Sequence, residues 1–444
     1  MKISVVGLGK LGSPLAALFA SKGFDVVGTD LNRSFVEAVN QRRAPVDEPG
    51  LQALIDAHGS HLRATSDAAA AVASTDVTFV IVPTPSDATG RFSNAAILRV
   101  MESVGDGIRG KRDYHLVVVT STVMPGSTGG EICQALELHS GRVLGPSLGL
   151  CYNPEFIALG SVLRDMLRPD MILIGESDQT AGDLLERIYV RSCDNRPVIR
   201  RMNFVNAELT KIAVNTFVTT KISYANMLAD LCDRLPGADI DVVSQAVGTD
   251  SRIGAKYLKG AIGYGGPCFP RDNVAFSTLA RSIGARCDLA EATDAINRYQ
   301  VDRVLAAVEH HHHGTGPIGI LGLSYKPDTA VVEESQGVAL AERLVQLGHD
   351  VVAYDPKALT AAEVPVWDAF KAASSAIDCI RQAATIVVMT PWPEFRDLPA
   401  AAFAPAHGRK TVIDCWRLLS PDVAAVAELL YLGQGTATPV ETIV

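Results

Sequence analysis

KISVVGLGKLG, residues 2–12, begins with an uninterrupted apolar run and ends in a cluster of glycines. Such a run is typical of a buried parallel strand. A helical pattern over residues 14–21 comes next, and a second apolar strand, DVVGTD, ends at Asp30. This order predicts a dinucleotide-binding turn, in which glycines let the backbone approach a pyrophosphate at a helix N-terminus. The glycines concerned are Gly7, Gly9 and Gly12.

Asp30 indicates which dinucleotide is bound. An acid at the end of the second strand can bind the ribose hydroxyls and would repel a 2′-phosphate, which favours NAD over NADP. Arg33 stands nearby and could offset part of that repulsion. A lone glycine turn could equally be an ordinary tight connection, but here the strand, the helix and the acid stand in the required order.

The C-terminal part of the chain repeats this plan. In the N-terminal part, further strands are expected at 77–82 and 116–120. In the C-terminal part, residues 318–324, IGILGLS, again predict a strand followed by a glycine turn. GHDVVAYD, ending at Asp355, parallels GFDVVGTD, ending at Asp30, and ATIVVMTPWPEF parallels DVTFVIVPTPS. Because the second turn lacks a full GxGxxG, it is better suited to the nucleotide of a substrate than to NAD. The pattern predicts an α/β protein with two Rossmann-like doubly wound domains.

A largely helical region joins the two domains, with one long helix over residues 206–235 that would span about 45 Å. The expected boundaries are 1–202 for the NAD-binding domain, 203–300 for the helical region, 301–314 for a linker and 315–444 for the second Rossmann-like domain, which would bind the nucleotide of a substrate. His310–His313 lie in that linker and are interpreted as a solvated hinge rather than a metal site. Apolar side chains along the long helix predict a homodimer or a larger even oligomer. They are Ile212, Phe217, Ile222, Met227 and Leu231.

Composition excludes several classes of protein. The chain has 444 residues with 48% hydrophobic and 20% charged residues, which is enough to form folded cores. Its 40 basic and 49 acidic residues give a net charge of −9, which argues against a nucleic-acid partner. No apolar run reaches the roughly 18 residues of a membrane span, and no export signal is visible. Eight cysteines without CxxC or zinc spacing indicate reduced thiols and a cytoplasmic protein with no bound metal.

The stretch GYGGPCFPRD, residues 263–272, is the most informative for chemistry. Three glycines and a proline before a cysteine predict a loop that exposes backbone and holds the Cys268 thiol in place. Asp272 follows four residues later, so a helix starting after the loop would bring both side chains to one face. Any single cysteine can be an inert core residue, but a thiol beside a base in this setting favours a nucleophile.

Two other stretches supply candidate catalytic groups. Glu155, in CYNPEFIALG, follows an apolar segment and could act as a general base on water. Lys211 and Asn215, in AELTKIAVN, share one face of the long helix and could hold a developing oxyanion. Taken alone, each would be better interpreted as an ordinary surface or capping residue.

Together these motifs resemble the nucleotide-sugar 6-dehydrogenases, the UDP-glucose and GDP-mannose dehydrogenase family. The resemblance extends from GLGKLG to IDCWR near residue 417, and the loop around Cys268 is its most specific part. It implies an NAD-dependent, four-electron oxidation of a sugar 6-hydroxymethyl to a carboxylate through a thiohemiacetal and a thioester on Cys268. UDP-glucose is the foremost expected substrate, with GDP-mannose and UDP-N-acetylhexosamines as alternatives. A single-step hydroxyacid dehydrogenase and a non-catalytic nucleotide-sugar-binding protein are more remote alternatives. The other motifs that carry the resemblance are VPTPSD, STVMPGST, NPEF, ELTKIAVN, LGLSYKPDT and TPWPEF.

The resemblance also implies roles for individual residues. Lys211 and Asn215 would stabilise oxyanions, and Glu155, helped by Thr122 and Asp272, would direct the attacking water. Arg252 resembles a residue that reaches a neighbouring subunit's site, and Arg417 one that approaches the sugar. The remaining expected cofactor contacts are Lys10, Leu11, Pro83 and Thr84, and the remaining substrate contacts are Phe156, Ile157, Lys256, Tyr257, Lys259, Tyr264, Gly265 and Lys326.

Two positions depart from the family pattern. Leu159 stands where the family usually has a glutamate, so a substrate hydroxyl aimed at it would lack an acceptor, at a cost of about 1–3 kcal/mol. Either another acceptor serves the sugar, or the substrate presents an apolar group there. Glu333 stands where the family has an arginine expected to approach NAD.

Overall fold

The computed structural model describes residues 1–313, 316–360, 370–405 and 409–435, and it divides into two compact units. The first unit is Met1–Ala213 and the second is Val214–Val444. The boundary falls inside the long helix α9, Phe204–Arg234, which has 31 residues. Residues 206–235 were expected to form this helix, so the expected and observed ends agree within two residues.

The first unit is built on an eight-stranded sheet with the order β3-β2-β1-β4-β5-β6-β7-β8. Neighbouring strands pair parallel except β6 and β7, which pair antiparallel. The order reverses between β1 and β4, so this sheet has the doubly wound switch point at which ligands bind. The strands are β1 Lys2–Val6, β2 Asp25–Thr29, β3 Leu62–Thr65, β4 Val77–Val80, β5 His115–Val119, β6 Leu148–Tyr152, β7 Met171–Glu176 and β8 Val198–Met202.

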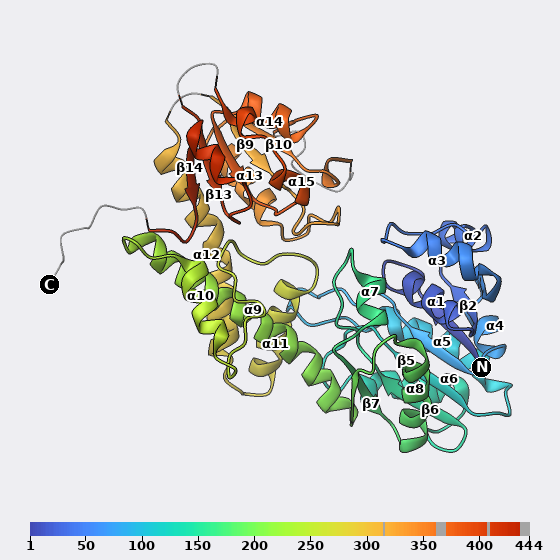
Figure 1. Ribbon diagram of the computed structural model, residues 1–444. Coiled ribbons are helices and arrows are strands. Elements are labelled where there is room, and N and C mark those ends of the chain that lie inside the picture. The colour runs from blue at the N-terminus through green and yellow to red at the C-terminus, as the bar shows by residue number, and fades with distance from the viewer. Residues whose placement is uncertain (314–315, 361–369, 406–408, 436–444) are drawn as a thin grey trace. The chain divides into compact units, whose positions relative to one another are not determined.

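Helices cover both faces of this sheet, as Figure 1 shows for the blue-to-green part of the chain. One hydrophobic core joins α1, α3, α7 and α8 to the strands, and the other joins α5 and α6 to the opposite face. Burial on both faces explains why strands such as HLVVV are apolar throughout instead of alternating. The helices are α1 Gly12–Ser21, α2 Arg33–Asn40, α3 Leu51–His58, α4 Ala68–Ala73, α5 Ala95–Arg109, α6 Cys133–Ser140, α7 Val162–Leu167 and α8 Gln179–Ser192, with short turns η1 Gly59–His61 and η2 Thr128–Ile132.

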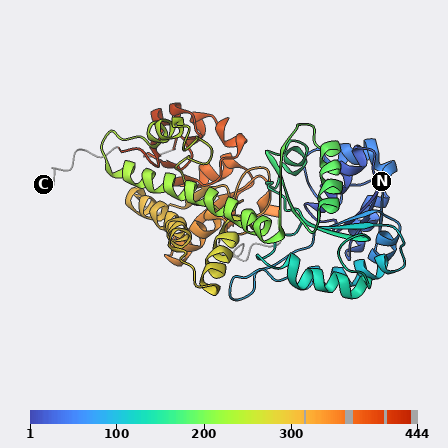
Figure 2. The same ribbon diagram turned by 90° about the horizontal axis from the view of Figure 1, so that it is seen from below.

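Helices open the second unit and confirm the expected helical region between the two sheets. They are the C-terminal part of α9, α10 Ile240–Thr249, α11 Phe269–Ser282 and α12 Asp288–His311. Helices α9 and α12 lie side by side in Figure 2, and Ser223 Oγ on α9 donates to the carbonyl of Thr293 on α12. This pair forms the support on which the cysteine-bearing loop rests.

The segment expected to be a linker, 301–314, is for the most part helical. Helix α12 continues to His311, and its apolar residues pack into the core of the second sheet. Their spacing of three or four residues is the helical period, and this buried stripe outweighs the polar histidine run that suggested a hinge. Gly314 and Thr315 lie outside the described residues. The apolar residues are Val301, Val304, Leu305 and Val308.

The second sheet has six strands in the order β11-β10-β9-β12-β13-β14, and all neighbouring strands pair parallel. Its order matches the first six strands of the other sheet, which confirms the predicted pair of Rossmann-like folds. The strands are β9 Ile318–Leu321, β10 Val351–Tyr354, β11 Lys371–Ala372, β12 Thr385–Val388, β13 Thr411–Asp414 and β14 Glu428–Tyr431. The helices are α13 Gln336–Gln346, α14 Ala376–Gln382 and α15 Pro393–Arg396, with short turns η3 Ala358–Thr360, η4 Ala400–Phe403 and η5 Pro421–Ala425.

Two kinds of feature are absent from the described ranges. Within them, no helix combines the length and the apolarity needed to cross a bilayer. Among the same residues, no group of three or more His, Cys, Asp or Glu side chains is arranged to hold a metal ion.

Candidate active site

The turn after β1 has the geometry of a dinucleotide cradle. Gly7 has φ +99°, and a Cβ built on it would lie 2.0 Å from the carbonyl oxygen of Ile81. A Cβ on Gly12 would lie 1.8 Å from the carbonyl oxygen of Gly7, so two positions must be glycine for the turn to close. Gly9 differs, because a Cβ there would meet nothing within 4 Å. The bare backbone at Gly9 therefore faces open space at the head of α1, where a pyrophosphate could approach.

Asp30 is held in place at the end of β2. Its Oδ2 accepts from Leu8 N at 2.7 Å, and its Oδ1 accepts from Asn32 N at 2.7 Å. A carboxylate has about four acceptor sites, so both oxygens retain capacity for ribose hydroxyls. Lys10 is exposed and Leu11 is half-buried in the intervening turn. These residues fit NAD, which would lie with its pyrophosphate at Gly9 and its ribose at Asp30.

The loops after β4 and β5 are cross-linked at the same edge of the sheet. Thr84 Oγ1 donates to the carbonyl of Thr122 at 2.8 Å, and Ser121 Oγ donates to the carbonyl of Val82 at 2.7 Å. The carboxyl ends of parallel strands share one edge, so Pro83, Thr84 and Thr122 lie beside the glycine turn after β1.

Glu208 was not among the predicted site residues. It lies on α9, fully buried, and its carboxylate accepts from Gly126 N at 2.6 Å and Thr128 N at 2.7 Å. Burial raises the pKa of this carboxyl, while the bonds to Thr128 and Gly126 lower it. Glu208 thereby fixes the loop that carries Thr122. The only signal in the sequence was its position in ELTK, one turn before Lys211.

Glu155 has the properties of a general base. It follows β6 and Pro154, and its Oε1 lies 3.3 Å from the hydroxyl of Tyr189 on α8. Burial raises the pKa of Glu155 to about 7, against the smaller opposing effects of the Tyr189 hydrogen bond and the Lys211 charge. A base with a pKa near the working pH is best suited to transfer protons.

Lys211 is joined to the Glu155 loop within the first unit. Its Nζ donates to the backbone carbonyl of Glu155 at 2.6 Å and lies 4.6 Å from the ring centroid of Phe156. The side chain is buried, with 7% exposure, so its charge acts in a medium of low polarity. The predicted residues Glu155, Phe156 and Lys211 are thus brought together. Ile157 and Leu159 instead pack against the first core.

Asn215, one turn further along α9, is joined to Asp272 within the second unit. Asn215 Nδ2 donates to Asp272 Oδ2 at 2.6 Å, and both side chains are buried. Asp272 lies in the first turn of α11, where its backbone N–H donates to the carbonyl of Cys268 at 2.8 Å. The helix predicted to start after the loop therefore exists, and the Cys268 residue occupies its N-cap position.

Cys268 is exposed, but the loop leading to it is not. Residues 260–266 are all buried, which contradicts the expectation of a loop that exposes its backbone. The glycines serve close packing: a Cβ on Gly265 would lie 2.2 Å from the carbonyl oxygen of Glu334, and one on Gly266 would lie 2.5 Å from the Tyr325 ring. A rigid buried segment thus ends in a thiol presented at the surface of the unit.

The expected substrate loop, residues 250–259, turns several polar side chains outward. Arg252, Lys256, Tyr257 and Lys259 are exposed. Arg252 pairs with Asp250 at 2.6 Å in this chain, and Lys259 Nζ lies 5.9 Å from the Trp416 ring centroid. Because these four side chains are exposed, they are accessible to a ligand.

Three other predicted substrate contacts are placed differently. Tyr264 is buried, with its ring edge-on to Phe269, and Lys326 is half-buried. Arg417 forms ion pairs within the second unit, with Asp239 at 2.6 Å and with Asp241 at 3.2 Å. The carboxylates of α10 and the residue before it were too distant in sequence to reveal this pairing.

Glu333, the second departure from the family pattern, contacts the cysteine loop through its backbone. Its side chain is exposed, while its carbonyl accepts from Gly266 N at 2.9 Å. The backbone contact at this position therefore does not depend on which side chain stands there.

A Rossmann unit with an open glycine at its switch point, accompanied by a presented thiol, defines the class: the chain is an NAD-dependent oxidoreductase. It belongs to the UDP-glucose/GDP-mannose dehydrogenase family. The family's NAD binding domain matches residues 1–192, its central domain residues 205–299 and its UDP binding domain residues 319–421. Membership removes the hydroxyacid-dehydrogenase alternative.

Relatives of this chain include UDP-glucose and GDP-mannose 6-dehydrogenases. The UDP-glucose 6-dehydrogenase AglM of Haloferax volcanii is 36% identical over 90% of this chain and 93% of its own length. The GDP-mannose 6-dehydrogenase of Pseudomonas putida is 33% identical over 80% of this chain and 81% of its own. Among solved structures, a UDP-glucose dehydrogenase from Pyrobaculum islandicum superposes with a TM-score of 0.88 at 34% identity, covering 99% of this chain and 98% of that one.

Proposed function

We propose that this protein oxidises the 6-hydroxymethyl group of a nucleotide sugar, UDP-glucose foremost, to the carboxylate. The observation that carries the proposal is the exposed Cys268 thiol at the end of a buried glycine loop, in a chain whose relatives include UDP-glucose 6-dehydrogenases. The balanced reaction converts R–CH₂OH, two NAD⁺ and water to R–COO⁻, two NADH and three H⁺. When bound, NAD supplies the hydride acceptor for each of the two oxidations.

Cys268 holds the substrate between the two oxidations. Its sulfur adds to the aldehyde carbon, and the sulfur's proton passes to the carbonyl oxygen, which gives a hemithioacetal. After the second oxidation the same carbon is a thioester, and water displaces the thiolate to release the acid. A thiol suits both steps because it is a strong nucleophile and a good leaving group.

The surrounding residues act on oxygen atoms. Lys211 and Asn215, buried one turn apart on α9, offer donors to the oxygen that becomes negative in the tetrahedral states. Glu155, with a pKa of about 7, takes the proton of the attacking water. Thr122 and Asp272 hold that water.

The choice of UDP-glucose over GDP-mannose and the UDP-N-acetylhexosamines is supported by AglM and by TuaD of Bacillus subtilis. TuaD is a UDP-glucose 6-dehydrogenase that is 31% identical over 97% of this chain. Thermal melting with a panel of nucleotide sugars tests it, because a ligand that binds only the folded state raises the melting temperature. A shift with GDP-mannose and none with UDP-glucose would overturn the substrate assignment.

Replacing Cys268 with serine tests the covalent route. Serine keeps the volume but is a poor nucleophile and leaving group, so turnover should fall at least about 100-fold, within the range that single catalytic groups contribute. The melting shift with the sugar nucleotide should survive. The wild type should form two NADH per acid. Near-normal turnover of the serine variant, or one NADH per turnover with free aldehyde, contradicts the proposal.

The proposed assembly is a homodimer or a larger even oligomer formed through α9. Phe217, Tyr224, Met227 and Leu231 are exposed large apolar side chains on that helix. Two of the residues expected to form this stripe do not belong to it, because Ile212 is fully buried and Ile222 is half-buried. Steps of 7, 3 and 4 residues put the exposed set on one face. Sedimentation of a fully active monomer would contradict the interface.

A reducing compartment is also proposed. All eight cysteines lie in the described ranges, and no disulfide joins any two of them. Free thiols persist in the cytoplasm and are generally oxidised outside it, so the set supports a cytoplasmic enzyme.

A further inference from the structure

The segment that leads to Cys268 has buried backbone but belongs to no helix or strand. Residues 260–266 are buried, and residues 261–266 form only bends and irregular chain. Buried N–H and C=O groups require partners, and no neighbouring strand provides them here. For residues 261, 262 and 264 the partners come from side chains on the two helices that flank the segment, whereas Gly266 N donates to the backbone carbonyl of Glu333.

Asn226 on α9 supplies the first pair of bonds. Its Oδ1 accepts from Ala261 N at 2.9 Å, and its Nδ2 donates to the carbonyl of Ile262 at 2.8 Å. The side chain is fully buried. One amide thus takes the place of a neighbouring strand, with a donor and an acceptor on consecutive residues.

Asn297 on α12 supplies the second pair. Its Oδ1 accepts from Tyr264 N at 2.7 Å, and its Nδ2 donates to the carbonyl of Tyr264 at 3.0 Å. Asn297 is 5% exposed. Gly263 lies between Ile262, which Asn226 bonds, and Tyr264, which Asn297 bonds. A Cβ on Gly263 would lie 2.7 Å from Asn297 Oδ1 and 2.6 Å from Gln336 Oε1.

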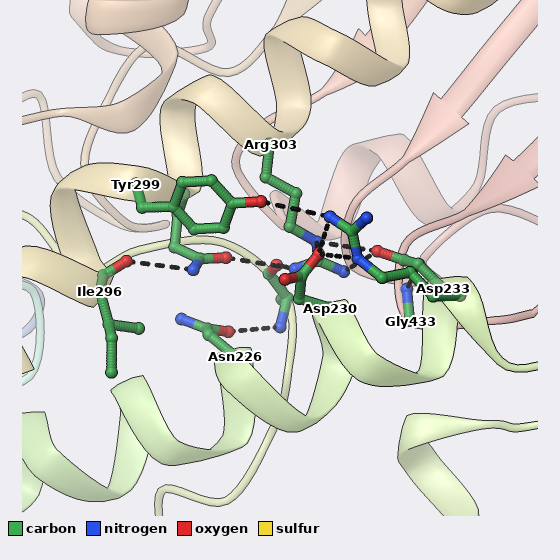
Figure 3. A network of polar contacts seen from close by, with 10 residues as sticks. Asn226, Asp230, Asp233, Ile296, Tyr299, Arg303 and Gly433 are labelled. Carbon is green, nitrogen blue, oxygen red and sulfur yellow. Dashed lines mark hydrogen bonds and ion pairs between the residues drawn. The ribbon is translucent and has the colours of Figure 1, made fainter. Parts of the chain in front are cut away.

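An ion pair between a buried arginine and a half-buried aspartate secures the helices that carry the two amides. Figure 3 shows Arg303 of α12 directed at Asp233 of α9, and their closest approach is 2.5 Å. Arg303 Nη1 also donates to the carbonyl of Ala261 at 3.3 Å, and Asp233 Oδ1 accepts from Gly433 N at 2.5 Å. The start of the segment is therefore held from α9 and from α12 at once.

Beyond Tyr264 the chain has little freedom before it reaches the thiol. Gly265 and Gly266 press against Glu334 and Tyr325, and Gly266 adopts φ +84°, which only glycine takes readily. Cys268 then begins α11. Few backbone rotations thus separate residues 261–264 from the Cys268 sulfur, so the position of the sulfur depends on where those residues are held.

We propose that Asn226 and Asn297 are positioning residues that fix the Cys268 thiol for attack on the aldehyde. The proposal rests on the proposed function. Neither amide touches the substrate, so their role is exerted through the backbone of 261–264. Loosening that backbone should harm the step that needs sulfur and spare the first oxidation.

The test uses Asn226→Ala and Asn297→Ala in the full-length enzyme with UDP-glucose and NAD. Acid formation should fall about 100-fold, the usual cost of a reacting group displaced by about 1 Å, with KM for the sugar nucleotide changed less than about threefold. Aldehyde that sulfur fails to capture should be trapped by semicarbazide, so NADH formed per acid should rise above two. Gly263→Ala, which pushes on the Asn297 amide instead of removing it, should give the same result.

Ser223→Ala is the matched control. Ser223 lies one turn before Asn226, is 1% exposed and bonds the carbonyl of Thr293 on α12, so its loss weakens the same helix pair without touching the segment. It should lower the melting temperature while acid formation and stoichiometry stay at the wild-type values. The inference is overturned if Ser223→Ala and Asn226→Ala lose the same stability and the same rate of acid formation. The amides would then have only a structural role.

A second readout does not depend on the substrate. Iodoacetamide labelling, followed at the Cys268 peptide by mass spectrometry, reports whether the thiol is still presented. Labelling should slow in both asparagine variants and remain unchanged in Ser223→Ala, with the Cys287 peptide as internal reference. Labelling at or above the wild-type rate overturns the inference. If wild-type enzyme releases aldehyde and forms one NADH, the proposed function fails, and labelling still decides whether the amides hold the thiol.

Discussion

The two Rossmann units share a plan down to individual side chains. In the first unit, Lys111 precedes β5 and its ammonium donates to the carbonyl of Val72, in the last turn of α4, and to that of Thr75 just after the helix. In the second, Lys410 precedes β13 and donates to the carbonyls of Ile380 and Ala383 at the end of α14. Burial lowers the pKa of both lysines. The similarity of strand order therefore extends to how one helix is capped.

The units differ where a ligand would bind. Gly9, which faces open space, corresponds to Ser324, and Asp30 corresponds to Asp355. Asp355 is 1% exposed, and its carboxylate is occupied by its own chain. Its donors are Leu323 N, Ser324 N, Ser324 Oγ, Lys357 N, Ala358 N and Trp392 Nε1.

The third glycine of the turn is present in the second unit but displaced. A Cβ on Gly337 would lie 2.4 Å from the carbonyl oxygen of Gly322, as one on Gly12 would lie 1.8 Å from that of Gly7. The spacing is 15 residues, 337 minus 322, instead of 5, 12 minus 7. The additional residues include Tyr325 and Glu334, which pack on the cysteine loop. The same architecture thus serves NAD in one unit and supports the thiol in the other.

Asp355→Ala should have the largest effect on this comparison. The substitution leaves several buried neutral donors without an acceptor at about 1–3 kcal/mol each, so a total loss of at least about 3 kcal/mol is expected. The free energy of unfolding, measured by urea denaturation, should fall by that amount. Asp30→Ala is the control and should change it by less than about 1 kcal/mol, since one of its two hydrogen bonds is exposed and the other is only partly buried. Equal destabilisation would mean that the two acids are equivalent.

Gly9→Val should act on NAD binding and not on folding. A Cβ built on Gly9 meets no protein atom within 4 Å, so a small side chain should fit the free enzyme and obstruct the bound pyrophosphate. NAD affinity should fall by about 10–100-fold, corresponding to the 1–3 kcal/mol of a steric conflict. Calorimetric titration with NAD measures it. An unfolded variant would contradict the open geometry, whereas Gly12→Ala is expected to destabilise the fold.

Asp30 should make the enzyme prefer NAD over NADP. Juxtaposed like charges cost several kcal/mol, and 1.4 kcal/mol is tenfold, so kcat/KM should favour NAD by at least about 100-fold. Asp30→Ser should reduce that ratio, mainly by improving NADP. Equal use of both cofactors by the wild type would show that Arg33 or another cation neutralises the acid.

The smallest expected effect concerns the pH profile. Because burial raises the pKa of Glu155 to about 7, and the base must be ionised, the rate of acid formation should rise as the pH passes through about 7. The Tyr189 hydrogen bond favours the ionised carboxylate, so Tyr189→Phe should move the limb to higher pH. The shift should stay below about one unit, because one hydrogen bond contributes about 1 kcal/mol. A shift to lower pH would contradict the assigned bond.

The sequence by itself determined the two α/β units, the NAD-binding turn, the long helix and the thiol with its glycine loop. These depend on local patterns, namely apolar periodicity and the spacing of glycines, which neighbouring residues impose on the backbone. Only the tertiary structure decided what each residue faces. Asp30 and Asp355 follow matching strands, but only Asp355 accepts a hydrogen bond from a distant side chain, that of Trp392, 37 residues further along the chain. Glu208, Asn226 and Asn297 acquire their roles from loops 33 to 82 residues away, and Arg417 from acids 176 to 178 residues away. Hydrogen-bond saturation of a buried group depends on partners brought together by folding, and no local pattern encodes them.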